Sequence, residues 1–132
     1  GAFGTTYLAY DLEDEGQSVA AKRVAMPDST PEAVQREVDI MRSLSHQNIV
    51  HMLGSCRIDD GSWIFMELLE SGDLFAEVER LGFLSEARAV NYTRQLMHGV
   101  AYCHAHGVVH RDLKLENLML TRDGCLKIID FG

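Results

Sequence analysis

The chain has 132 residues, of which 46% are hydrophobic and 24% charged, which suits about one globular domain. Its net charge of −8 and the lack of a basic cluster argue against nucleic acid or an anionic membrane as the main partner. Its short apolar runs, the lack of a signal peptide and three widely spaced cysteines predict an intracellular protein, cytoplasmic or nuclear.

The chain opens with strand-like sequence. Two runs rich in apolar residues span 5–12 and 17–26, and an acidic, turn-prone stretch separates them. This pattern predicts an antiparallel pair of strands. Two more strands are expected at 48–58 and 62–69, around a second turn.

A helix is expected between the two strand pairs, over residues 28–45. Ser29 or Thr30 offers an N-terminal cap, and Pro31 suits the first helical position. Glu37 lies at the edge of the predicted apolar face. That face contains Val34, Val38, Met41 and Ser45.

The second half of the chain changes to helical periodicity. One helix is expected within 70–82 and a longer one within 84–107, with Ser85 as its cap. A metal site in "CHAHG" is disfavoured, because His104 and His106 are two residues apart and face opposite sides of a helix. The apolar stripe of the longer helix is predicted to contain Ala89, Leu96, Val100 and Cys103.

The last segment predicts a strand at Val108–Val109, a polar loop, and two short strands around a turn. The order of the predicted strands and helices along the chain is that of the α+β class, with two unequal regions. Residues 1–69 are rich in predicted strands, and residues 70–132 are mainly helical.

Five polar features stand out from this apolar framework. Each alone has an ordinary explanation as a turn or a solvated side chain, but together they suit phosphate chemistry. Glycine amides can approach a phosphate, a lysine can neutralise its oxygens, and a carboxylate with an amide oxygen suits Mg²⁺. In chain order they are Gly1 with Gly4, Lys22, Glu37, Asp112 with Asn117, and Asp130.

These residues resemble the signature motifs of the eukaryotic protein kinases. "GAFGTT" is similar to the second half of the glycine-rich loop without its first glycine, and "VAAK" to the strand-lysine motif. "HRDLKLEN" is similar to the catalytic loop, and "DFG" follows it. The resemblance covers the whole chain. It implies a β-rich N-lobe with a helix C, the first section of a helical C-lobe, and truncation at both ends.

The resemblance implies that the cofactors are ATP and Mg²⁺ and that a protein hydroxyl receives the γ-phosphoryl group. Lys22 would contact the ATP phosphates and pair with Glu37. Asp112 would orient the substrate hydroxyl, and Lys114 would meet the γ-phosphate. The Mg²⁺ ligands would be Asn117 and Asp130.

The same resemblance implies a binding place for the nucleotide base and a regulatory spine. Met66 would be the gatekeeper, and Asp73 would reach the ribose or a basic substrate residue. The other nucleotide contacts would be Gly1, Gly4, Ala20, the backbone of Glu67 and Leu69, and Met119. The spine would be Met41, Met52, His110 and Phe131.

By the same resemblance, Lys114 favours serine/threonine specificity, and the style of "HRDLKLEN" and "ESGDLF" is similar to that of the calcium/calmodulin-dependent-like kinases. Arg111 implies control by phosphorylation through an upstream kinase. The expected partner is a protein with a Ser or Thr hydroxyl, and the negative net charge allows a basic one. We expect a fragment of a longer gene product. The alternatives are a non-catalytic kinase fragment that binds a nucleotide or a partner, and a small-molecule kinase of similar architecture.

Overall fold

The computed structural model describes residues 4–13, 16–25, 30–59 and 61–131. Its helices and strands divide into two compact units, and each unit draws on separate stretches of the chain. Unit 1 contains Gly1–Ser43, His51–Leu68 and Phe131–Gly132, and unit 2 contains Leu44–Val50 and Leu69–Asp130. Within the described residues, no helix is long and apolar enough to cross a membrane.

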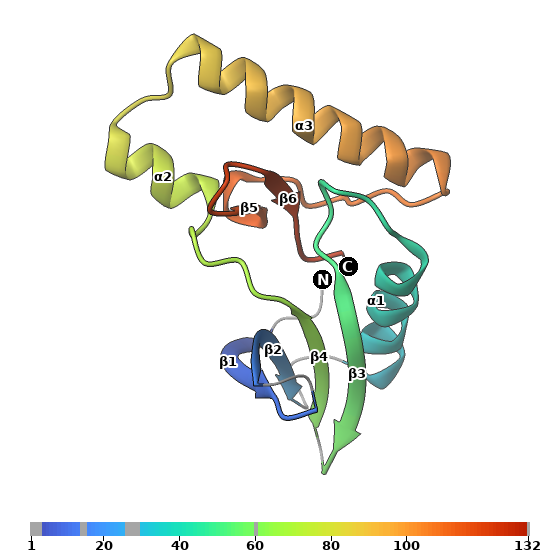
Figure 1. Cartoon of the computed structure of the whole chain (residues 1–132). Helices are drawn as coiled ribbons and strands as arrows, with labels where there is room; N and C mark the ends of the chain where they lie inside the picture. The colour runs from blue at the N-terminus through green and yellow to red at the C-terminus, as the bar shows by residue number, and fades with distance from the viewer. Residues whose placement is uncertain (1–3, 14–15, 26–29, 60, 132) are drawn as a thin grey trace. The chain divides into compact units, whose positions relative to one another are not determined.

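Unit 1 is built on a four-stranded antiparallel sheet with the strand order β1-β2-β4-β3 (Figure 1). Short connections join the strands of each hairpin, as expected for antiparallel neighbours. The strands are β1 (Thr5–Asp11), β2 (Gln17–Ala25), β3 (Met52–Ile58) and β4 (Gly61–Glu67). All four strands predicted for this region of the sequence are therefore present.

Helix α1 (Pro31–Ser43) completes unit 1 and lies beside β3 in Figure 1. Thr30 caps it, because the Thr30 Oγ1 atom accepts the N–H of Ala33 at 3.2 Å. The predicted cap and the predicted first position are thus confirmed for Thr30 and Pro31, whereas Ser29 lies outside the described residues. The buried face of the helix carries Val34, Val38 and Met41.

The predicted face of α1 is wrong at Ser45. The helix ends at Ser43, so Ser45 lies beyond the helical repeat and is exposed, while its neighbour Leu44 is buried. Glu37 is also buried, although the periodicity put it at the solvated edge of the face.

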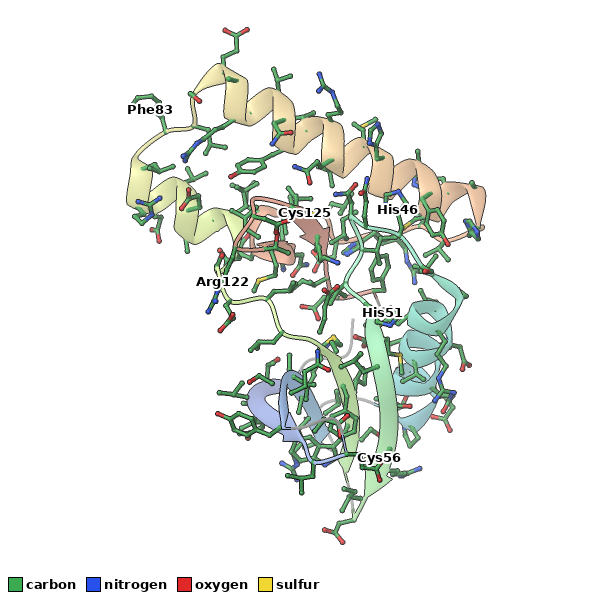
Figure 2. The ribbon with its side chains drawn as sticks, in the orientation of Figure 1. His46, His51, Cys56, Phe83, Arg122 and Cys125 are labelled. Carbon is green, nitrogen blue, oxygen red and sulfur yellow. The ribbon has the colours of Figure 1, made fainter. Side chains whose placement is uncertain are left out.

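Unit 2 contains helices α2 (Leu74–Leu81) and α3 (Glu86–Ala105). Ser85 caps α3 as predicted, since its Oγ atom accepts the N–H of Arg88 at 3.3 Å. Phe83 points away from the turn between the helices (Figure 2). The unit also contains the short helical turn η1 (Leu115–Asn117) and the hairpin of β5 (Leu118–Leu120) and β6 (Leu126–Ile128).

The strand expected at Val108–Val109 is wrong. Gly107 adopts a φ of 72°, and the N–H of Val108 donates to the Cys103 carbonyl oxygen at 2.9 Å. These features end α3 in a tight turn, which satisfies one of its last carbonyl groups. Val109 then keeps 62% of its surface exposed, and within the described chain the segment pairs with no strand.

The stretch 48–51 does not belong to β3, so the predicted strand at 48–58 begins too early. Val50 N–H donates to the Ile128 carbonyl oxygen at 3.0 Å, and Ile128 N–H donates to the Asn48 carbonyl oxygen at 2.9 Å. The Asn48 side chain also donates to the Leu126 carbonyl oxygen and to Gln95 Oε1. Residues 48–50 therefore run along β6 within unit 2.

Of the stripe predicted on α3, Cys103 is fully buried, whereas Leu96 and Val100 are half-buried. The unpredicted buried position is Gly99. A Cβ atom there would lie 2.8 Å from Ile128 Cδ1 and 3.2 Å from the Asn48 carbonyl oxygen. The absence of a side chain at Gly99 thus lets α3 approach β6 closely.

Candidate functional site

Unit 1 holds a buried ion pair between β2 and α1. Lys22 Nζ lies 2.8 Å from Glu37 Oε1, and the two side chains keep 7% and 1% of their exposure. A charge is tolerated in such a place only when it is paired or hydrogen-bonded. Lys22 is therefore not a surface lysine, and Glu37 is not a solvated helix residue.

The ladder of β2 and β4 shows which residues share the Lys22 face of the sheet. Ala20 lies directly opposite Met66, and Lys22 directly opposite Ile64. Opposite residues of an antiparallel pair point to the same face, and alternate residues along a strand do so too. Ala20 and Met66 therefore share a face with Lys22, which suits a flat ligand whose phosphates meet the lysine.

The two predicted loop glycines differ in what the structure shows. Gly1 lies outside the described residues. A Cβ atom on Gly4 would collide with the backbone carbonyl oxygen of Arg23 on β2. This close approach to β2 therefore explains why residue 4 is a glycine without any ligand. A role of Gly4 toward phosphate would be additional to this structural role.

Unit 2 contains the polar loop that the sequence singled out. Lys114 Nζ lies 3.2 Å from Asp112 Oδ2. Asn117 Nδ2 donates to the Asp112 main-chain oxygen at 2.9 Å and to Oδ2 at 3.2 Å. The Asp112 carboxylate is thus exposed but fixed in direction by two neighbours, of which Asn117 is itself buried.

The hydrogen bond from Lys114 holds the pKa of Asp112 below its usual range. The positive charge of Lys114, the Asn117 amide and His110 add to this effect, and partial loss of water acts against it. Asp112 therefore stays ionised at neutral pH and can accept a hydrogen bond from a hydroxyl group.

His110 anchors the start of the loop from a buried position. Its Nε2 atom lies 2.7 Å from the Ile129 carbonyl oxygen, and its Nδ1 atom accepts the N–H of Asp112 at 3.2 Å. Nε2 must carry the proton in this arrangement, because Nδ1 is an acceptor. The imidazole thereby links the Asp112 backbone to the residue just before Asp130.

Asp130 and Asn117 lie at neighbouring points of the same unit. Ile129 N–H donates to the Asn117 carbonyl oxygen at 3.0 Å. Asp130 and Arg111 adopt φ values of 60° and 69°, a left-handed conformation that is uncommon for residues with a side chain. Strained backbone of this kind often occurs where a side chain is held in place for function.

The donor set of Asn117 and Asp130 fits Mg²⁺. The Asn117 Nδ2 atom is bonded to Asp112, so its Oδ1 atom is the group that would serve a cation. Mg²⁺ prefers a few oxygen ligands and fills its other positions with water and phosphate. Among the described residues, no three His, Cys, Asp or Glu side chains gather at one point, so a multi-carboxylate site is not the arrangement seen there.

Asp73, a predicted contact of the ribose or of a basic substrate residue, has another role in this structure. Asp73 caps α2, since its Oδ1 atom accepts the N–H of Ala76 at 2.8 Å, a role that sequence reasoning missed although an acid before a helical repeat signals it. Met119 is half-buried on β5, and Leu69 is half-buried at the start of its unit 2 segment. The Glu67 N–H donates to the His51 carbonyl oxygen.

Of the predicted spine, Met52 is half-buried and the others are buried: Met41, His110 and Phe131.

Comparison with known proteins decides the family. The family model described as "Protein kinase domain" matches residues 1–132. The chain belongs to the protein kinase family. It is 42% identical over 139 aligned residues to mitogen-activated protein kinase kinase kinase 19 of Homo sapiens, and it covers 10% of that protein. It is 38% identical to mitogen-activated protein kinase kinase kinase ANP1 of Arabidopsis thaliana and covers 21% of it.

The kinase chain thus spans only a tenth to a fifth of these relatives, although all of it aligns with them. Their names give no support to the expected calcium/calmodulin-dependent group, since both are named mitogen-activated protein kinase kinase kinases. The segments behind that expectation, "HRDLKLEN" and "ESGDLF", are short and do not decide between such groups.

The kinase fold is confirmed by a solved structure. The chain matches the crystal structure of Rad53 1-466 in complex with AMP-PNP with a TM-score of 0.92 and 29% sequence identity. The match covers 99% of this chain and 36% of that chain. The predicted α+β class, a strand-rich region followed by helices, is therefore correct.

Proposed function

We propose that the chain is the ATP-binding and catalytic-loop portion of a protein serine/threonine kinase. The reaction is transfer of the γ-phosphoryl group of Mg-ATP to a protein hydroxyl. The observation that carries the proposal is the Asp112 carboxylate, exposed, ionised and oriented by Lys114 and Asn117. Such a group is suited to a hydroxyl nucleophile, and phosphoryl transfer depends mainly on positioning and charge neutralisation.

In the proposed reaction, the substrate oxygen bonds to the γ-phosphorus as the bond to the ADP oxygen breaks. Asp112 accepts the hydroxyl proton, and Lys114 neutralises charge on the transferred group. Lys22, oriented by Glu37, binds the other phosphates. When bound, Mg²⁺ neutralises phosphate oxygens, and its protein ligands would be Asn117 and Asp130.

The nucleotide base would lie against the sheet face shared by Ala20 and the gatekeeper Met66. Glu67 would contribute its carbonyl oxygen, because its N–H donates to His51. The remaining contacts belong to the proposal as the resemblance gave them. They are the main chain of Leu69, the side chain of Met119, Asp73 toward the ribose or a basic residue of the substrate, and the backbone of Gly1 and Gly4.

Two finer features also belong to the proposal. The protein substrate carries a Ser or Thr hydroxyl, for which Lys114 is the supporting residue. Arg111, exposed and next to Asp112, would receive a phosphate placed by an upstream kinase. In domain terms, residues 1–69 would be the N-lobe and residues 70–132 the first section of the C-lobe.

The proposal is tested in the full-length protein that contains this chain. We expect Asp112→Asn to reduce transfer of radiolabelled phosphate from ATP to myelin basic protein by about 10²–10⁴-fold, with ATP binding kept. Lys22→Met and Asp130→Ala should abolish transfer while leaving the protein folded. If wild type binds ATP but transfers no phosphate, the chain acts as a nucleotide-binding module. If all three variants keep wild-type activity, the assigned roles are wrong.

A further inference from the structure

A hollow lies on the unit 1 sheet, on the face that points away from Lys22. Its volume is about 300 Å³, and its walls include Ala9, Val19, Gly54 and Phe65, one residue from each strand. Val19 lies three positions from Lys22 on β2, so the two side chains point to opposite faces. The hollow is therefore separate from the proposed nucleotide site on the Lys22 face.

The hollow exists because of Gly54. In the ladder of β3 and β4, Gly54 lies directly opposite Phe65, just after a shift of register at Met52. A Cβ atom built on Gly54 would meet no heavy atom within 4 Å. Cross-strand side chains normally pack on each other, so the missing side chain leaves open space across the ladder from Phe65, which lines the hollow.

The rim of the hollow is apolar and open to solvent. Leu12 keeps 91% of its surface exposed and Leu53 keeps 49%, and both line the hollow. Single exposed apolar side chains are common, but a group of them around one concavity is typical of an interaction site.

The charged groups at the hollow are acidic. Asp11 lines it, and Asp11 Oδ1 accepts the N–H of Glu13 at 2.9 Å. Glu67, which does not line the hollow, lies directly across from Val19, and its Oε1 atom accepts the N–H of His51 at 2.8 Å. None of the described lining residues is Lys, Arg or His, and none of the ion pairs found among the described residues involves Asp11.

We propose that this hollow is a docking site for a segment of a partner protein in which an apolar side chain stands next to a lysine or arginine. The apolar side chain would occupy the space at Gly54 against Phe65. The cation would meet Asp11, and its long aliphatic stem would lie over Leu12. The volume suits one or two side chains, so the affinity would come from this anchor and from the charge contact.

The test measures peptide binding to the full-length protein by fluorescence polarisation. The probes are labelled short peptides in matched sets, in which an apolar residue is flanked by lysine, by serine or by glutamate. Gly54→Leu fills the hollow, and its new side chain meets open space, so the sheet should tolerate it. Arg57→Leu is the matched control, because it adds the same side chain to β3 outside the hollow.

We expect the lysine set to bind tightest, Gly54→Leu to weaken it by about tenfold or more, and Asp11→Lys to weaken it as well. Arg57→Leu should bind like wild type, and binding of an ATP analogue by Gly54→Leu should confirm that the variant is folded. The proposal is overturned if no set binds, if the glutamate or serine set binds as tightly, or if Gly54→Leu binds like wild type. Because the readout is peptide binding, this result is independent of phosphoryl transfer.

Discussion

Lys22 and Glu37 form an ion pair, 2.8 Å from Nζ to Oε1, in a place where both side chains are almost fully withdrawn from water. We expect Glu37→Gln to lower the free energy of unfolding by about 3 kcal/mol, because it removes the carboxylate that lies 2.8 Å from a buried lysine. Urea denaturation followed by circular dichroism measures the difference.

Removal of both charges from this pair makes a sharper test. The double variant Lys22→Met/Glu37→Leu should be more stable than Glu37→Gln, since apolar side chains of similar size remove the desolvation cost. A double variant that is less stable than Glu37→Gln would show that the pair stabilises the fold by its own attraction. Phosphoryl transfer should be lost in both variants.

The second prediction concerns the pH dependence of catalysis. Lys114 lowers the pKa of Asp112, so Asp112 stays ionised as the pH falls. In Lys114→Met the pKa of Asp112 should rise, and the acidic limb of the pH profile of kcat/KM should move to higher pH. Steady-state assays between mildly acidic and neutral pH check this. Lys127→Met is a control that removes one lysine elsewhere in unit 2, and its acidic limb should stay in place.

The third prediction concerns the close approach of α3 to β6. Alanine is the better helix former by about 1 kcal/mol, so Gly99→Ala should be stabilising on propensity alone. We expect net destabilisation of about 1–2 kcal/mol, because the new Cβ atom would lie 2.8 Å from Ile128 Cδ1, in a closely packed place. Thr93→Ala, exposed on the same helix, should gain stability. Equal gains in the two variants would contradict the packing argument.

The fourth prediction concerns His46, whose Nδ1 atom accepts the N–H of Asn48 at 3.0 Å and whose ring stacks on Tyr102. Burial lowers the pKa of His46 from its usual 6.5, and the nearby His98 and Lys127 lower it further. The unfolded chain therefore takes up the proton first as the pH falls.

This linkage predicts that the contribution of His46 to the free energy of unfolding is complete above pH 6.5. It is lost as the pH falls from there toward the lowered pKa of His46 in the folded state. His46→Gln should flatten the dependence of the unfolding midpoint on pH across this window. His104→Gln, at an exposed position, is the control with one histidine fewer. A wild-type midpoint that is constant across the window would contradict the prediction.

Sequence reasoning was most successful where the signal is local. Thr30 and Ser85 cap their helices as predicted, because a hydroxyl before a helical repeat bonds to an amide only three residues away. The periodicity of α1 alone was insufficient for Glu37, which it put at the solvated edge of the helix face. The resemblance to the protein kinases implied that Glu37 pairs with Lys22, and the structure confirms this pair.

Both wrong strand predictions arose because the backbone groups of the segment bond to partners that the local sequence does not reveal. An apolar run favoured a strand at Val108–Val109, but the turn at the end of α3 uses the Val108 N–H. The stretch 48–51 has the composition of a strand, yet Asn48 and Val50 bond to Ile128 rather than to β4.

The positive φ values of Arg111 and Asp130 were also unpredictable, since residues other than glycine give little sign of this conformation.

The pairing of residues 48–50 with β6 has a practical consequence for dissection of the molecule. Unit 1 is discontinuous, because its chain departs at Ser43 and returns at His51. A single cut after Leu68 would release the sheet together with a segment whose Ile49 and Val50 are buried within unit 2. Separate expression of the two halves should therefore give insoluble products, and a split-protein reporter would reassemble better if a copy of 44–50 were supplied with the C-terminal piece.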